Sequence, residues 1–378
     1  MKYFTFLAII SIILSCQRKD NGHFNEDLLY LVDTVVIDSK GRILDLDTYI
    51  FKSDLDDEKS SLFLFNKFDH SIDEIDMDDL EVVNNYSFEP EGPDGTGRYV
   101  YNINVLKGGL IFIKSNNGSA VFDKNGGVSK KIDWVNSKNS KGLKYGLIPQ
   151  NEIPFGSEEL KVFGLSYDNK NRDVILDVLS VKENSVKRFD IDIEKSYRNF
   201  VLTVDDQQGY TFLDPIVYLK SENEFIMVSH QFSNEIYLFN GDGEHVQTIH
   251  YEPQMTTSRP KDLSGKSISS FKQIQIEYQH FLEQVRFGPP VWDRIKKRYL
   301  RLSASRVFSD TRSRESSLLP DIEEVKVYLS LFDADFNLIS EVHIPELTTE
   351  FVKYFAKDGK LWVFQNISDE LGFIVIDI

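Results

Sequence analysis

The stretch between positions 286 and 314 is the part of this sequence best suited to bind a ligand. Nine basic side chains stand there against only Asp293 and Asp310, in a chain whose formal net charge is −17. Aromatic residues are interleaved with them, at Phe287, Trp292, Tyr299 and Phe308. Because arginine and aromatic residues are enriched where proteins bind partners, this stretch is predicted to be a binding surface. The alternative is that the basic residues pair with surplus acids nearby while the rings fill the core.

Arg301 has the most specific predicted role in this stretch. Alternate side chains of a strand face opposite sides, so in RYLRLSASRV Tyr299 and Arg301 share one face, and Leu300 and Leu302 the other. If this strand is the inner strand of one of several repeated sheets arranged around a channel, a fold predicted below, its apolar face packs between sheets and Arg301 lies on the polar side, near the channel. A guanidinium there would hold a carboxylate, phosphate or sulfate in a two-pronged contact. The predicted binding residues of this stretch are Trp292, Asp293, Tyr299, Arg301 and Arg306.

A second candidate is the turn FEPEGPDGTGRY at residues 88–99, which crowds three glycines and two prolines together. Glycine permits positive φ, and proline presets turn geometry. Exposed backbone N–H groups in such a turn can bind an anion, although a plain connection between repeats explains the composition equally well. The candidate binding residues here are Glu91, Gly92, Pro93, Gly95 and Gly97.

Metal, cofactor and nucleophile motifs are not recognisable. The seven histidines are scattered, without the paired spacing of a zinc site. Asp333-Ala-Asp335-Phe-Asn337 resembles the start of a calcium loop, but a turn made by Asp and Asn side chains explains it without metal. We therefore predict no metal, no cofactor and no catalytic residue.

The only cysteine, Cys16, follows a short apolar run that begins after Met1-Lys2. The run is too short to span a bilayer and has the length and flanks of a signal peptide. Ile13-Leu14-Ser15-Cys16 resembles the bacterial lipobox, which implies cleavage before Cys16 and lipid on its thiol and amino group. The alternative is an ordinary signal peptide with a chance cysteine. Gln rather than Asp at position 17 favours the outer over the inner membrane, on either of its sides.

The acidic balance argues against nucleic acid as a partner. The expected partners are the membrane, through the lipid anchor, and a protein, peptide or glycan. The chain is expected to be a monomer.

Four segments share an apolar run, a Phe, an Asn or Asp, and a turn, centred on Phe65, Phe122, Phe239 and Phe332. Ser180 and Ile374 mark two further units. The spacing, or pitch, is 57 to 59 residues from Phe65 to Phe239, 93 from Phe239 to Phe332, where an insertion lies, and 42 from Phe332 to Ile374. Each unit reads as β-hairpins, and six such units fit the blades of a six-bladed β-propeller. A β-sandwich is the alternative fold for so many short strands.

The predicted organisation has three parts. Residues 1–15 are a signal peptide, 16–26 a lipidated linker, and 27–378 an all-β propeller with a loop and helix insertion near 252–278. The chain ends on a strand, so the last blade lacks its outer strand. Residues 33–44 are predicted to supply it, because ring closure removes free sheet edges.

The lipobox, the pitch, EGPDGTG after the first hairpin and FGPPVWD…RYLRL in the fifth unit together resemble a family of Gram-negative lipoproteins of unknown function with TolB-like six-bladed propellers. The resemblance matches that family's Glu-Gly-Pro-x-Gly-x-Gly turn at Glu91–Gly97, and its Asp and YYR-like strand at Asp293, Tyr299 and Arg301. Leu300 departs from the second tyrosine of that strand. The resemblance implies fold and location, and it implies no activity.

Two kinds of function follow. The first is a membrane-anchored binding or scaffold module, because a propeller presents a rigid ring of loops around a channel. The second is a carbohydrate-active lyase or hydrolase whose residues converge from several blades.

Overall fold

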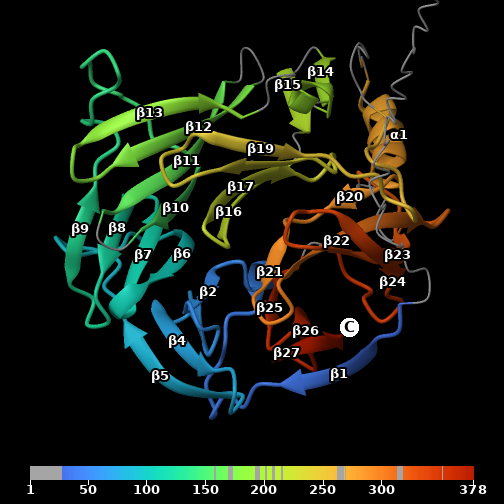
Figure 1. Ribbon diagram of the computed structural model, residues 1–378, viewed down its shortest axis with the longest axis horizontal. Helices are drawn as coiled ribbons and strands as arrows, with labels where there is room; N and C mark the ends of the chain where they lie inside the picture. The colour runs from blue at the N-terminus through green and yellow to red at the C-terminus, as the bar shows by residue number, and fades with distance from the viewer. Residues whose placement is uncertain are drawn as a thin grey trace, which may run out of the picture.

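The computed structural model describes residues 28–156, 159–168, 173–191, 196–200, 202–206, 209–213, 216–261, 268, 270–312, 318–350 and 352–378. It confirms the predicted fold, because six antiparallel sheets stand side by side around a central axis (Figure 1). No helix among the described residues is long and apolar enough to cross a membrane.

The first three blades follow one another along the chain, each running from an inner to an outer strand. Blade 1 contains β2 (Ser53–Leu55), β3 (Ser61–Asn66), β4 (Ser71–Asp76) and β5 (Glu81–Ser87). Blade 2 contains β6 (Val100–Leu106), β7 (Leu110–Ser115), β8 (Gly118–Phe122) and β9 (Val128–Ile132). Blade 3 contains β10 (Asn151–Phe155), β11 (Lys161–Asp168), β12 (Asp173–Ser180) and β13 (Ser185–Asp190).

The remaining blades complete the ring. Blade 4 contains β16 (Val217–Glu222), β17 (Phe225–His230), β18 (Ile236–Phe239) and β19 (His245–Ile249). Blade 5 contains β20 (Arg286–Phe287) and β21 (Val291–Asp293), both beside β22 (Arg298–Phe308), then β23 (Ile322–Phe332) and β24 (Leu338–His343). Blade 6 contains β25 (Tyr354–Lys357), β26 (Lys360–Ile367), β27 (Glu370–Asp377) and, as its outer strand, β1 (Leu31–Val36).

The predicted closure of the last blade by the N-terminal segment is confirmed. β1 pairs antiparallel with β27 from Leu31↔Asp377 to Val36↔Gly372. The strand is shorter and earlier than the predicted 33–44, because the chain leaves blade 6 at Ile37 and bridges to blade 1 through Asp38 and Glu81. One segment therefore ties the last blade to the first.

The predicted hairpin repeat is confirmed, but one of its units lies one strand out of phase with the others. Phe122, Ser180, Phe239 and Phe332 each end the third strand of a blade. Phe65 is the last residue but one of β3 (Ser61–Asn66), which is the second strand of blade 1. The phase differs from the prediction because both kinds of hairpin place an Asn or Asp directly after the Phe of an apolar run.

Two insertions depart from the blade pattern. The predicted short helix is present as α1 (Phe271–Leu282), which begins where the Ser270 side chain accepts a bond from the Gln273 N–H. A second insertion, which was not predicted from the sequence, carries the 3-10 turn η3 (Ser196–Phe200) and the hairpin of β14 (Leu202–Asp206) and β15 (Gly209–Leu213). Phe200 and Phe281 bring the two insertions together, with ring centroids 6.1 Å apart, outside the ring of blades (Figure 1).

Apolar side chains fill the spaces between blades rather than the middle of the ring. One cluster joins blades 5, 6 and 1, and four others join the remaining neighbouring pairs. Because both faces of a blade are buried in this way, strands such as β3 and β7 are apolar along most of their length. The middle of the ring is left for polar groups.

Candidate functional site

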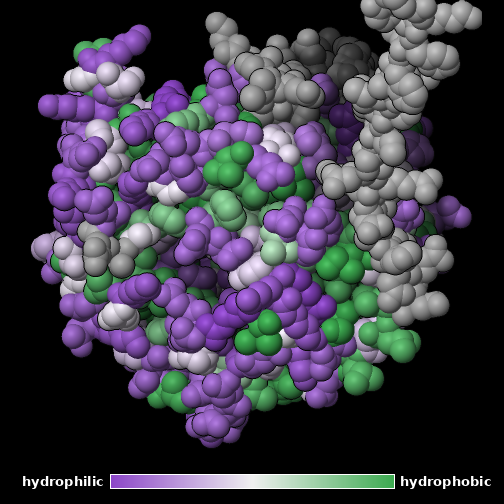
Figure 2. Space-filling model, in the orientation of Figure 1, coloured by the Kyte–Doolittle hydropathy of each residue, from purple (hydrophilic) through white to green (hydrophobic). Residues whose placement is uncertain are grey.

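A channel of about 1520 Å³ runs through the middle of the ring, and the inner strands of all six blades line it. The ring face turned toward the viewer in Figure 2 is mostly hydrophilic and is hollowed near its middle. Enclosed cavities at which several elements converge are the usual places for ligands in proteins. The channel is therefore the candidate site.

The two ends of the channel differ because the inner strands β2, β6, β10 and β16 run in the same direction through the ring. Residues just before or at the start of these strands, such as Tyr49, Tyr101 and Ile216, lie at one end, which we call the open mouth. The turns that follow these strands lie at the opposite end.

That opposite end is bridged across the ring. Lys59, from the turn after β2, donates to the Trp292 carbonyl at 3.1 Å, and Arg294 contacts Glu58. Both contacts join blade 1 to blade 5 and pass blade 6. A ligand therefore has more room to enter from the open mouth.

The inner strands bind one another through side chains, because no further strand pairs with their inner edges. Asp54 accepts from the Val105 N–H at 2.9 Å, Asn102 donates to the Glu152 carbonyl at 3.1 Å, and Asn151 donates to the Val217 carbonyl at 3.4 Å. Three contacts continue this belt around the ring: Glu222 to the Trp292 N–H, Tyr354 to the Pro289 carbonyl, and Lys353 to the Ser53 carbonyl. The belt holds the six blades in register around the channel.

Two of the cations that line the channel are Lys220 and Lys353. Lys220, on β16, is half-buried, and its ammonium has no hydrogen bond or ion pair with any residue that the structure describes. Burial lowers its pKa, against the opposing effect of Glu222 and Asp54. Burial, with a smaller effect of Lys220, lowers the pKa of Lys353 to about 8.

Tyr218 lies on the same face of β16 as Lys220, two residues earlier. Val217 and Leu219 point the other way, into the cluster between blades 3 and 4. The Tyr218 hydroxyl is buried and has no hydrogen-bond partner in the described part of the chain. Burial raises the pKa of Tyr218, so the hydroxyl stays protonated and can donate.

Three charged groups form a compact cluster beside the open mouth. Arg286 and Arg306 both contact the carboxylate of Glu350, and Arg306 and Glu350 line the channel. Burial lowers the pKa of Arg286 to about 10, with Arg306 adding to the effect. Two cations on one carboxylate leave one excess positive charge at the channel wall.

The predicted role of Arg301 is wrong. Its side chain is fully buried on β22, which is the second strand of blade 5 and not an inner strand. The guanidinium donates to the carbonyls of Gly288 at 2.8 Å, Asn234 at 2.7 Å and Ser233 at 3.2 Å. Both faces of this strand pack against neighbouring blades, so Arg301 ties blade 5 to blade 4 and does not face the channel.

Of the other predicted residues of this stretch, some line the channel and the others are buried within the blades. Trp292 and Arg306 line the channel. Tyr299 is fully buried and stacks on Phe336 at 3.9 Å between ring centroids. Asp293 is buried and accepts from the N–H groups of Ile295 and Lys296 and from Arg298.

The alternative reading of the basic stretch, as a counter-charge, is correct for five of its members, which the structure pairs with an acid. Arg286 and Arg306 both contact Glu350. Arg294 contacts Glu58 of blade 1, Lys296 contacts Asp377 of blade 6, and Arg298 contacts Asp293 of its own blade. Arg314 lies outside the described residues.

The glycine-rich turn connects β5 to β6 and does not line the channel. Its N–H groups at Gly95, Thr96 and Gly97 donate to the carbonyls of Gly92, Glu89 and Pro90 within the turn. They are not available as the expected anion nest. Gly97 has φ 99°, and a Cβ there would lie 2.5 Å from Ser115 Oγ, which explains the glycine. Glu91 and Pro93 take no part in the channel either.

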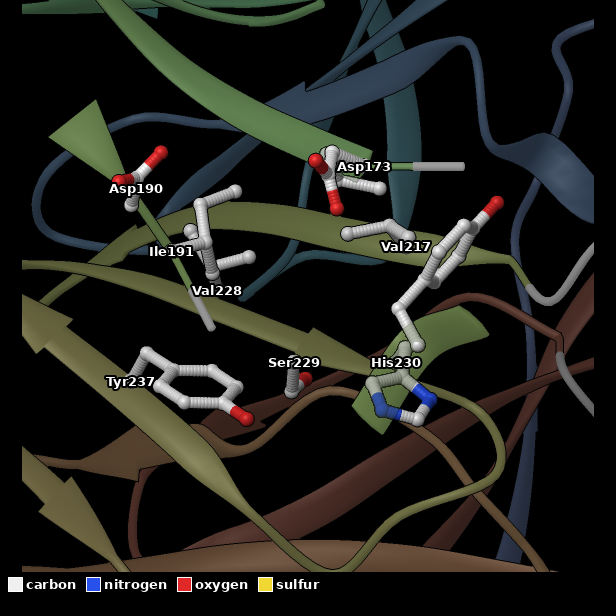
Figure 3. A pocket seen from close by; sticks show the side chains of 10 residues that line it. Asp173, Asp190, Ile191, Val217, Val228, Ser229, His230 and Tyr237 are labelled. Atoms are coloured by element: carbon white, nitrogen blue, oxygen red, sulfur yellow. The ribbon is translucent and has the colours of Figure 1, made fainter. Parts of the chain in front are cut away.

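A second pocket lies between blades 3 and 4, where Asp190, Val217, Ser229 and Tyr237 surround it (Figure 3). Its volume of about 30 Å³ is about that of one water molecule in the liquid. Among the described residues, no three His, Cys, Asp or Glu side chains are placed to hold a metal ion.

Sequence reasoning missed Lys220, Lys353 and Tyr218. A signal for two of them is present in VYLK, where Tyr218 and Lys220 alternate with the apolar Val217 and Leu219. That alternation indicates a strand with one polar face, which in a propeller belongs to the inner position.

Comparison with known proteins bears on fold and family. A family model described as Domain of unknown function (DUF4221) matches residues 22–343. A solved member of that family from Bacteroides vulgatus has a TM-score of 0.62 at 12% identity, covering 92% of this chain and 98% of that chain. An exported protein from Bacteroides fragilis has a TM-score of 0.53 at 9% identity, covering 94% of this chain and 98% of that chain. At such identities the likeness shows the fold alone, and no curated protein sequence matches.

Proposed function

This chain belongs to the DUF4221 family, whose function is unknown, and from its channel we propose that the propeller is a binding module for ligands that carry an anionic group. The observation that carries the proposal is the Lys220 ammonium, which stands in the channel without a partner among the described residues. An ammonium in such a partly enclosed cavity attracts a carboxylate, phosphate or sulfate more strongly than one in open water. Lys353 and the Tyr218 hydroxyl add a second cation and a donor to the same cavity.

The test is a binding measurement on the purified full-length chain. Tetraglutamate and tetragalacturonate are the anionic probes, and tetraglutamine and methyl-esterified tetragalacturonate are their neutral counterparts. Lys220→Met is expected to weaken binding of the anionic probes by about tenfold, as loss of a close charge pair does. Lys107→Met is the matched control, because Lys107 also lines the channel but is exposed at its bridged end. Equal affinity of Lys220→Met and the parent chain for both anionic probes would contradict the proposal.

The pH dependence of the same binding has a definite sign. An ammonium attracts an anion only below its pKa, and the pKa of Lys353 is about 8 next to Asp54, Lys220 and Glu222. Affinity for the anionic probes is therefore expected to fall as pH rises from 7 to 9.5. The free energy of unfolding of the ligand-free protein should instead rise over the same pH range. A lysine whose pKa is depressed in the folded state destabilises the fold less once it has lost its proton.

We infer further that a lipid on Cys16 holds this module at a membrane, with the outer membrane favoured by Gln17. The support is the lipobox-like ILSC sequence; Cys16 itself lies outside the described residues. Cys16→Ala is expected to abolish incorporation of labelled palmitate and to move the protein from the membrane fraction to the soluble fraction. A variant that is still labelled and membrane-bound would refute the anchor.

A further inference from the structure

Three half-exposed aromatic rings stand at the open mouth of the channel, from blades 1 and 2. The exposed fractions are 49% for Tyr49, 45% for Phe51 and 56% for Tyr101, and all three line the channel. Single exposed rings are common on protein surfaces, but several along one rim mark a place where another molecule binds.

The backbone adopts an unusual conformation to present two of these rings. Thr48, Tyr49 and Ile50 have φ of 53°, 54° and 55°, a left-handed run that β-branched residues such as Thr and Ile rarely adopt. The Asp47 carboxylate accepts from the Thr48 N–H at 2.9 Å, and the buried Ile50 side chain fixes the turn to the core. Strained backbone of this kind is concentrated at binding and active sites.

A second device presents the third ring. β6 pairs with β7 at Val100↔Ser115 and Asn102↔Lys114, so Tyr101 has no partner and forms a β-bulge. Bulges re-aim side chains next to functional sites. Two independent irregularities in neighbouring blades thus place aromatic rings on one rim.

Amide side chains accompany the rings. Gln150 is exposed directly before β10, and its side chain has no partner among the described residues. Asn102 and Asn151 line the same sector of the channel. An amide both donates and accepts hydrogen bonds, as each hydroxyl of a sugar does.

The inner strand edges do not favour an added peptide strand. Strand addition requires free backbone N–H and C=O groups, and side chains of the hydrogen-bonded belt already occupy several of them, including the Val105 N–H and the Glu152 and Val217 carbonyls. A ligand here must be held through side chains.

The geometry points to a carbohydrate subsite at the open mouth, in which Tyr49, Phe51 and Tyr101 stack on the pyranose faces of an oligosaccharide. The apolar C–H face of a pyranose covers an aromatic ring, while its equatorial hydroxyls reach amides such as Gln150. The inference rests on the proposed function, because the acidic group of the same oligosaccharide extends down the channel to Lys220. The ligand class is then an oligosaccharide that carries carboxylate or sulfate groups.

The experiment screens the full-length chain on an array of defined oligosaccharides, neutral, uronate-bearing and sulfated, with tetraglutamate titrated in parallel. Phe51→Ala and Tyr101→Ala are each expected to reduce sugar binding by about tenfold, since stacked aromatic anchors dominate such sites. Tyr99→Ala is the matched control, because Tyr99 is 62% exposed two residues away and does not line the channel. Tyr101→Phe and Tyr101→Trp should retain binding, which distinguishes stacking from a hydrogen bond of the hydroxyl.

The outcomes separate this inference from the proposed function. Loss of sugar binding in Tyr101→Ala and Phe51→Ala, but not in Tyr99→Ala, supports the subsite. If tetraglutamate binds in a Lys220-dependent way while no sugar does, the carbohydrate subsite is overturned and the anion-binding channel stands. Sugar binding that ignores both aromatic substitutions also overturns the subsite. Thermal melts of all variants check folding, and replacement of these exposed rings should change the Tm little.

Discussion

Deleting residues 31–36 is expected to unfold the propeller or to make it aggregate. The deletion removes six paired positions between β1 and β27, and it uncovers the side of the last blade on which Val32 and Val35 pack. At roughly 1 kcal/mol for each hydrogen bond, loss of six ladder positions should lower the free energy of unfolding by on the order of 5 kcal/mol. The exposed edge of β27 would then be free to pair with another chain.

The measurement is thermal and urea unfolding of the full-length chain, with light scattering for aggregation. Val35→Asp and Thr34→Asp form a matched pair within β1, because Val35 packs against the core and Thr34 is exposed. Val35→Asp should lower the free energy of unfolding by about 2 kcal/mol, and Thr34→Asp should change it by less than about 0.5 kcal/mol. An unchanged unfolding curve after the deletion would mean that β1 does not close the ring.

Arg301→Lys is expected to destabilise the protein by about 3–5 kcal/mol, because it leaves buried carbonyls without their donor at a cost of about 1–3 kcal/mol each. The guanidinium satisfies three carbonyls from two blades, and it lies over the Phe287 ring at 4.8 Å from the centroid. A lysine ammonium is a point charge that cannot reach all three carbonyls in one plane.

Chemical denaturation measures this effect, and Arg294→Lys is its control. Arg294 is a half-exposed partner of Glu58, so its replacement should cost less than about 1 kcal/mol. If Arg301→Lys were as stable as the parent chain, the buried bonds of Arg301 would not contribute to the fold.

The fold could be predicted because its information is local and repeated. The same strand, Asn or Asp and turn recur in β8–β9, β18–β19 and β23–β24, and a terminal strand without an outer neighbour implies closure. The phase error at Phe65 shows the limit. A hairpin motif identifies two adjacent strands, but it does not tell which two of the four they are.

The site was harder to predict because its decisive contacts are distant in sequence. The carbonyls that bury Arg301 come from residues 233, 234 and 288, and a two-faced strand pattern carries no information about them. The left-handed run at Thr48–Ile50 leaves no sequence signal at all, because its β-branched residues argue against it. Only the alternation of polar and apolar residues around Lys220 indicates a channel residue from sequence. The concentration of basic residues in the stretch 286–314 is the stronger signal, and it favours the wrong strand.

Because the last blade contains both the first and the last described strand, it is also the last blade that can be completed during synthesis. β1 is the first described strand to be synthesised and β27 the last, so the sixth sheet is incomplete until translation has passed Asp377. Blades 1 to 5 draw on consecutive chain and can form early, whereas the final pairing joins segments more than 330 residues apart. A chain emerging from a ribosome or a translocation pore would therefore form an open arc of five blades until its final strand arrives. The two ends of that arc would expose unpaired strands and apolar blade faces. Chaperones that delay pairing of those edges would act on this intermediate rather than on the finished ring.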